Sequence, residues 1–278
     1  MTSDPFPALD PAAIQDTRDA LHAWSRVLGG WLKQSRARRK HFWHASLRPS
    51  LTGLSSGVVR AGTDVELELD LVASRLRVRT LAREAVEELT GQSAARLAAW
   101  LDATLTEAGL DPTRAPGDEG PADTGFPGYD AVQARRLHRA LSSVAGALEK
   151  FRAGIREETS PIQVWPHHFD LSMLWLPGAR VSGQDPADEE NADRQMNCGF
   201  AFGDAGIAEP YFYIPAYPLP DALPSVPMPP GTPWRSDGFS GSLLLYRHLV
   251  ETHDPAAYLQ DLCSRLLAAG QHYLATDE

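Results

Sequence analysis

The chain has 278 residues, of which 43% are hydrophobic, and its seven tryptophans can help to fill the core of one large domain or two small ones. Its formal charge of -10 at pH 7 opposes attraction to phosphate backbones, so nucleic acid is not an expected partner. The first ten residues lack the basic start and apolar run of a signal peptide, and no later apolar run has the length of a bilayer. We therefore expect a cytoplasmic protein with no membrane partner.

The first part of the chain predicts a helix followed by strands. The helix LHAWSRVLGGWLKQSR spans residues 21–36 and is amphipathic. FWHASLRP, from residue 42, is interpreted as a strand that turns His44, Ser46 and Arg48 to its outer side, because successive side chains of a strand point to opposite faces.

Residues 65–81 predict a β-hairpin with charges on its outer face. VELELDL alternates apolar and charged residues, and RLRVRTL returns beside it. A tight turn between them pairs Asp70 with Arg77 and Glu68 with Arg79. Such a ladder of ion pairs is typical of solvated surface and is interpreted as such.

Residues 111–129 are rich in Pro, Gly and Asp, and are interpreted as a linker between a first part, 1–110, and a second part, 130–278. The helix LHRALSSVAGALEKFR, residues 137–152, matches the first helix, and a helix also closes each part, which indicates an internal duplication. The predicted fold class is α+β. Two related helix-strands-helix units form an antiparallel sheet, continuous across both parts, with helices packed on one face.

The stretch VWPHHFDLSML, residues 164–174, carries the candidate site. As a strand it turns His168, Asp170 and Ser172 to one face and an apolar set to the other, which must contact the helices. The polar set would then lie side by side on the open face of the sheet, with Trp165 near its end.

Two chemistries fit these residues if His44 and Arg48 of the earlier strand meet them on one surface. His44, His168 and Asp170 are side chains that a divalent transition metal could use as ligands. Without a metal, Asp170 can orient His168 as a general base, and Arg48 suits a ligand carboxylate or phosphate. The competing interpretation is structural, with histidines that bond neighbouring backbone and an Asp that forms an ordinary surface pair.

Residues 208–235 contain nine prolines and are interpreted as a covering loop laid over the protein, although extended proline-rich chain also suits the groove of a partner. Tyr213 and Tyr217 would then wall the open face. Cys198 and Cys263 lie among apolar residues and are interpreted as small core residues, and no nucleophile motif or phosphate loop is present.

Three stretches carry a family resemblance: LHAWSRVLG with HFWHASL, SPIQVWPHHFDLSMLWLPG, and EPYFYIPAYPLPD. In pattern and order they resemble an uncharacterised bacterial domain-of-unknown-function family, DUF5996, over nearly the full chain. The resemblance implies no reaction and no cofactor. From the residues themselves we expect a small-molecule site with groups suited to an enzyme. The alternative is a non-catalytic interaction module that uses the same aromatic-rich face for a protein partner or for self-association.

Overall fold

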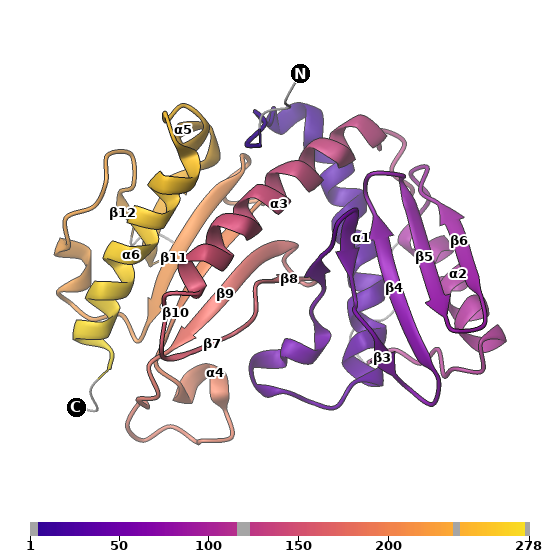
Figure 1. Cartoon of the computed structure of the whole chain (residues 1–278), viewed down its shortest axis with the longest axis horizontal. Helices are drawn as coiled ribbons and strands as arrows, with labels where there is room; N and C mark the ends of the chain where they lie inside the picture. Colours follow the sequence, from indigo (N-terminus) through magenta and orange to yellow (C-terminus); the bar gives the residue numbers. More distant parts are fainter. Residues whose placement is uncertain (1–4, 116–122, 236–239, 276–278) are drawn as a thin grey trace. The chain divides into compact units, whose positions relative to one another are not determined.

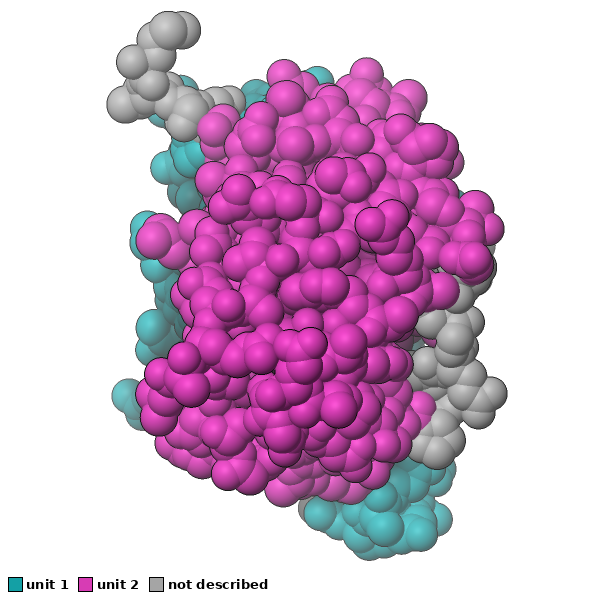
Figure 2. All heavy atoms as spheres, turned by 90° about the vertical axis from the view of Figure 1, so that its right-hand side faces the viewer, with its two compact units in different colours: residues 1–8, 143–162, 170–278 teal, residues 9–142, 163–169 magenta. Residues whose placement is uncertain are grey.

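The computed structural model describes residues 5–115, 123–235 and 240–275, and the chain divides into two compact units (Figures 1 and 2). Unit 1 contains residues 1–8, 143–162 and 170–278, and unit 2 contains residues 9–142 and 163–169. The boundary near residue 142 falls inside helix α3 (Ala131–Arg152). The predicted linker, 111–129, lies in part outside the described residues and stays a prediction. Both units combine helices with antiparallel strands, which confirms the α+β class.

Unit 2 begins with its longest helix, and a sheet and a second helix follow. Its elements are α1 (Pro11–Ser35), η1 (Lys40–Ala45), β1 (Arg48–Pro49), β2 (Gly53–Ser55), β3 (Val59–Arg60), β4 (Asp64–Asp70), β5 (Arg75–Thr80), β6 (Glu84–Glu88), α2 (Ala94–Glu107), the first part of α3, and β8 (Gln163–Trp165). The strands pair antiparallel in the order β1-β2-β4-β5-β6, and β3 also pairs with β4.

The core of unit 2 lies between this sheet and the helices α1 and α2, which Figure 1 shows behind β4, β5 and β6. Helix α1 begins ten residues before the predicted span. Pro11 stands at its first position, and the Asp10 carboxylate caps it by accepting the Ala12 N–H at 3.0 Å. Trp24 and Trp31 of α1 are fully buried. Their indole N–H groups donate to main-chain carbonyls at 3.0 and 2.9 Å, so burial leaves no unpaired donor.

Unit 1 contains the remaining elements, again a meander of strands followed by a helix. They are the last part of α3, β7 (Glu158–Thr159), β9 (Asp170–Leu176), α4 (Glu189–Ala192), β10 (Gln195–Ala201), β11 (Tyr211–Tyr217), η2 (Leu223–Ser225), β12 (Trp234–Arg235), β13 (Gly241–Leu245), α5 (Tyr246–Val250) and α6 (Pro255–Tyr273). The strands follow the order β12-β13-β11-β10-β9-β7, and each neighbouring pair is antiparallel.

Helix α6 packs on β10 and β11 and closes the core of unit 1. Its residue Gly270 leaves room for the strands, because a Cβ there would lie 2.2 Å from Met196 Sδ and 3.1 Å from the Trp175 ring. Cys198 of β10 and Cys263 of α6 are buried and free, as the sequence predicts for core residues.

The prediction of one continuous sheet is wrong. The strands β1-β2-β4-β5-β6 form one sheet, and the strands β12-β13-β11-β10-β9-β7 form another. Each sheet is built mainly from strands that are near one another along the chain. The internal duplication stays a prediction. Within the described ranges, no helix combines the length and apolar content needed to cross a membrane.

Candidate functional site

The histidine pair of the candidate stretch lies on a turn and not on a strand. Residues 166–169 form this turn, and the Trp165 carbonyl accepts the N–H groups of His168 and Phe169 at 3.3 and 2.8 Å. Phe169 has φ +54°, which breaks the alternation of side chains on which the prediction depended. His168 and Asp170 are therefore not neighbours on one strand face. This part of the prediction is wrong.

The turn is held against α1 within unit 2. Gly29 of α1 approaches Pro166 so closely that a Cβ would lie 2.6 Å from the proline Cβ. Phe169 is buried and stacks on His22 of α1, with ring centroids 6.0 Å apart, and His22 Nε2 lies 3.0 Å from the His167 carbonyl oxygen. Burial, reinforced by His168 and His22, lowers the pKa of His167 to about 4.

Asp170, the first residue of β9, is buried at 4% exposure on the sheet of unit 1. Tyr213 of β11 donates its hydroxyl to Asp170 Oδ2, although β10 lies between the two strands. Gly199 of β10 is opposite both Ser172 and Tyr213, and the Tyr213 ring lies over it. A Cβ at Gly199 would be 2.1 Å from Tyr213 Cζ, so only glycine leaves the space that this ring occupies.

The buried hydroxyl of Tyr213 also hydrogen-bonds Ser172, and Ser172 is fully buried. Burial and the neighbouring Asp170 raise the pKa of Tyr213 well above its usual value of 10, so the phenol is a neutral hydrogen-bond donor at physiological pH. Three residues predicted for the site, Asp170, Ser172 and Tyr213, thus lie together in unit 1, and we name them the Asp170 cluster.

The strand predicted from Phe42 is a 3-10 helix, η1, so His44 does not point outward from a sheet. His41 and Phe42 have positive φ values, which a strand does not allow. The His44 ring is buried, and its Nδ1 accepts the Arg39 N–H at 3.2 Å. Burial and Arg38 lower the pKa of His44, and the structural interpretation fits this histidine.

The chain segment after η1 does meet the candidate stretch within unit 2. Leu47 and Val164 exchange backbone hydrogen bonds of 3.0 and 2.8 Å, and Ser46 donates to the Gln163 side chain at 2.8 Å. Arg48 begins β1, and Trp165 ends β8 as a buried residue. Because His168, His44, Arg48 and Trp165 belong to unit 2, their proximity to the Asp170 cluster stays a prediction.

The proline-rich segment includes strand β11, which carries Tyr213 and Tyr217 within the sheet, and also η2 and β12. Tyr217, at the end of β11, donates its hydroxyl to the Asn191 carbonyl at 3.3 Å. In the part of the chain that the structure describes, no group of three or more His, Cys, Asp or Glu side chains is arranged to hold a metal ion.

The charged hairpin of unit 2 differs from the solvated ladder that the sequence predicts. Arg77 and Asp70 form the predicted ion pair at 2.9 Å, and Arg79 and Glu68 form theirs at 3.2 Å. The Asp70 side chain, however, is only 3% exposed. These residues line a concavity that sequence reasoning missed. The hydroxyls of Ser50 and Thr52 bond Glu68 at one side of it.

Comparison with known proteins identifies a family and gives no described relative. A family model described as "Family of unknown function (DUF5996)" matches residues 6–277. No curated protein and no solved structure matches the chain.

Proposed function

Because the chain belongs to DUF5996, a family of unknown function, we propose its function from its own side chains: it binds a small polar molecule at the Asp170 cluster of unit 1. The observation that carries the proposal is the hydrogen bond from Tyr213 to the buried Asp170. It spans three strands and depends on the missing side chain of Gly199. A charged carboxylate is seldom buried without a specific partner, and such groups concentrate at functional sites.

The cluster has the groups to recognise a ligand and to move a proton. Asp170 can accept a hydrogen bond or a proton from a ligand N–H or O–H group. The single proton of the neutral Tyr213 phenol, which points at Asp170, can then turn to a ligand oxygen once the ligand bonds Asp170. A carboxylate beside a neutral phenol also suits general acid–base catalysis. In this proposal Asp170 is the base, Tyr213 the donor, and Ser172 positions the Tyr213 hydroxyl.

The proposal depends on the Asp170 cluster alone. Within unit 2, Arg48 is proposed separately as a group that suits a carboxylate or phosphate, and His168 as one that can exchange a proton. His44, Trp165 and Tyr217 have no role in the Asp170 cluster.

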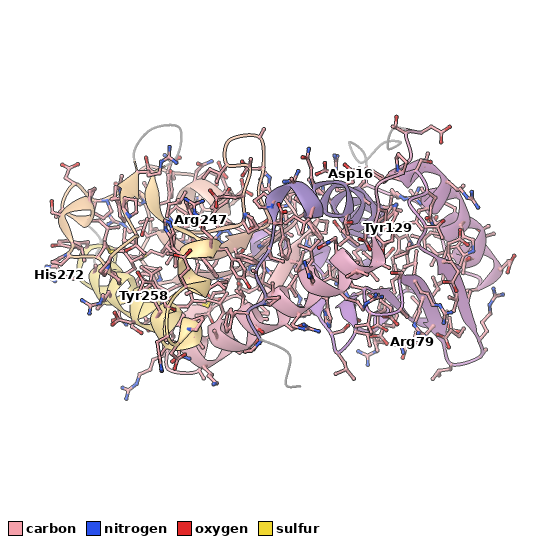
Figure 3. All side chains as sticks on the ribbon, turned by 90° about the horizontal axis from the view of Figure 1, so that it is seen from above. Asp16, Arg79, Tyr129, Arg247, Tyr258 and His272 are labelled. Atoms are coloured by element: carbon pink, nitrogen blue, oxygen red, sulfur yellow. The ribbon has the colours of Figure 1, made fainter. Side chains whose placement is uncertain are left out.

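A thermal-shift screen of the purified chain with metabolites and divalent metals tests the proposal. A ligand that binds only the folded chain raises its stability by about 2.7 kcal/mol at a hundred times its Kd. We expect a stabilising compound for the wild type, a much smaller shift for Asp170→Asn, and an intermediate shift for Tyr213→Phe. Tyr258→Phe is the matched control, because Tyr258, labelled in Figure 3, is a phenol of the same unit that bonds the Pro230 carbonyl.

The alternative function, a protein interaction module, gives a different result in the same assay. Exposed apolar side chains, among them Leu81 and Val86 near the edge strand β6 of unit 2, are the observation that favours it. A chain that associates through such a surface melts at a temperature that rises with protein concentration and responds to no small molecule.

A further inference from the structure

The charged face of the unit 2 sheet is hollowed into a concavity of about 440 Å³. We call it the charged concavity. It is lined by Ser50, Leu51, Thr52, Glu66, Glu68, Asp70, Arg77 and Arg79. Its volume falls in the range of small-molecule sites. Because it lies wholly within unit 2, it is independent of the Asp170 cluster.

The walls of the charged concavity are fixed by hydrogen bonds. Glu68 accepts the hydroxyls of Ser50 and Thr52 at 2.7 and 2.9 Å and the guanidinium of Arg79 at 3.2 Å. Asp70 accepts Arg77 twice, at 2.9 and 3.1 Å. Both carboxylates are engaged by these hydrogen bonds, so they form the frame of the concavity and not its binding groups.

Arg79, labelled in Figure 3, has hydrogen-bond donors that the residues of the frame do not use and that a ligand can accept. Its side chain is 43% exposed, and towards the described residues it donates only through Nη2, to Glu66 and Glu68. Guanidinium N–H groups form a planar fork that matches a carboxylate. Both forks of a guanidinium include Nη2, which in Arg79 donates to Glu66 and Glu68, so a ligand carboxylate can accept single N–H groups of Arg79, from Nε or Nη1.

Glu66 supplies the acceptors. It is 29% exposed and receives Ser55 at 2.6 Å and Arg79 at 3.1 Å, and a carboxylate offers about four acceptor sites. The lining contains three carboxylates (Glu66, Glu68, Asp70) and two guanidiniums (Arg77, Arg79), a net charge of -1. This surplus favours a positive group on the ligand next to Glu66.

We propose that the charged concavity binds a free α-amino acid. The carboxylate of the amino acid pairs with Arg79, its ammonium pairs with Glu66, and its side chain contacts Leu51, which is 93% exposed. An amino acid carries both charges, so it can pair with Arg79 and with Glu66 at once. A simple anion would be repelled by the surplus negative charge of the lining, and a simple cation would leave the Nε and Nη1 groups of Arg79 without a ligand acceptor.

Titration calorimetry of the whole chain with three related probes tests this assignment. The probes are L-leucine, 3-methylbutylamine, which lacks the carboxylate, and N-acetyl-L-leucine, which lacks the ammonium. We expect L-leucine to bind and each analogue to bind at least about tenfold more weakly, because each loses one charge-assisted pair. No heat from L-leucine or glycine at about 10 mM, ten times a weak millimolar Kd, would overturn the proposal, as would equal affinity for the three probes.

Variants of unit 2 locate the bound probe. Arg79→Gln should weaken L-leucine at least about tenfold, while Arg83→Gln, the control, removes an arginine whose exposed ion pair with Glu107 lies outside the concavity. Leu51→Ser alters an exposed position and so should leave folding intact, yet it should weaken L-leucine and spare glycine. Unchanged L-leucine affinity in both Arg79→Gln and Leu51→Ser would refute the location.

Discussion

Gly199→Ala should dislodge Tyr213 from Asp170. The added Cβ would lie 2.1 Å from Tyr213 Cζ and 2.4 Å from both Cε1 and the hydroxyl oxygen, where carbon atoms in contact normally stand about 3.5–4.0 Å apart. The ring must therefore move by more than an ångström, and the hydroxyl leaves Asp170. Overpacking costs about 1–3 kcal/mol, and a lost hydrogen bond to a charged group costs about 1.5–3 kcal/mol. We expect Gly199→Ala to lower the free energy of unfolding by about 3–5 kcal/mol.

Urea denaturation of a double-mutant cycle measures this effect. In a Tyr213→Ala background the added methyl group meets no ring, so Gly199→Ala should be nearly neutral, and alanine in a strand is even favoured over glycine by about 0.5–1 kcal/mol. A loss below about 1 kcal/mol in the wild-type background, or the same loss in both backgrounds, would show that the Tyr213 ring does not depend on Gly199.

Three further predictions concern unit 2, the histidines and the cysteines. Arg77→Gln should lower the free energy of unfolding by about 2–3 kcal/mol, because it removes the guanidinium that pairs with the buried Asp70 carboxylate. In the same urea titration Arg83→Gln, which removes an exposed ion pair, should cost less than about 1 kcal/mol. Burial is the chief cause that lowers the pKa values of His22, His138 and His167. Below about pH 6.5 the unfolded chain therefore binds more protons at these histidines than the folded chain does. Their contribution to the free energy of unfolding is complete above that pH and decreases as the pH falls. The urea midpoint should therefore decrease from pH 7 to pH 5, and an unchanged or higher midpoint at pH 5 would contradict this. Cys198 and Cys263 should resist a thiol reagent such as Ellman's reagent in the folded chain and react with it in urea. Both thiols are buried, and the hydrogen bond with Cys198 raises the pKa of Cys263. Rapid reaction in buffer without urea would contradict this prediction.

The sequence predicted the α+β class and several strands because their periodicity is local. Strand β4 and strand β5 both lie where apolar and charged residues alternate. The register was wrong, because Asp70 is opposite Arg75 and not Arg77. The connection runs through four residues, 71–74, yet the long Arg77 side chain still reaches Asp70 diagonally.

Burial of the charged face could not be read from the hairpin alone. Ser50 and Thr52 lie between the short strands β1 and β2, which carry too few residues to show a period of two. Only the fold brings their hydroxyls to Glu68.

The candidate site was predicted in part for the same physical reason. Asp170, Ser172 and Tyr213 come together because β9 and β11 flank the glycine of β10, an arrangement that follows once the strands pair in chain order. The His168 prediction failed at Phe169, whose positive φ is rare for an aromatic residue. Tertiary contacts of Phe169 with His22 and of Pro166 with Gly29 accompany that backbone, and neither contact appears in a strand pattern.

The most direct test of the central claim is the affinity of a compound selected by the thermal-shift screen, measured by calorimetry on the wild type and on Asp170→Asn. The substitution keeps the shape of the side chain and removes its charge, so the proposal predicts folded protein with affinity at least about tenfold lower, the loss expected for one charge-assisted hydrogen bond. Equal affinity of the two proteins for the compound would contradict the assignment of Asp170 as the ligand-binding group.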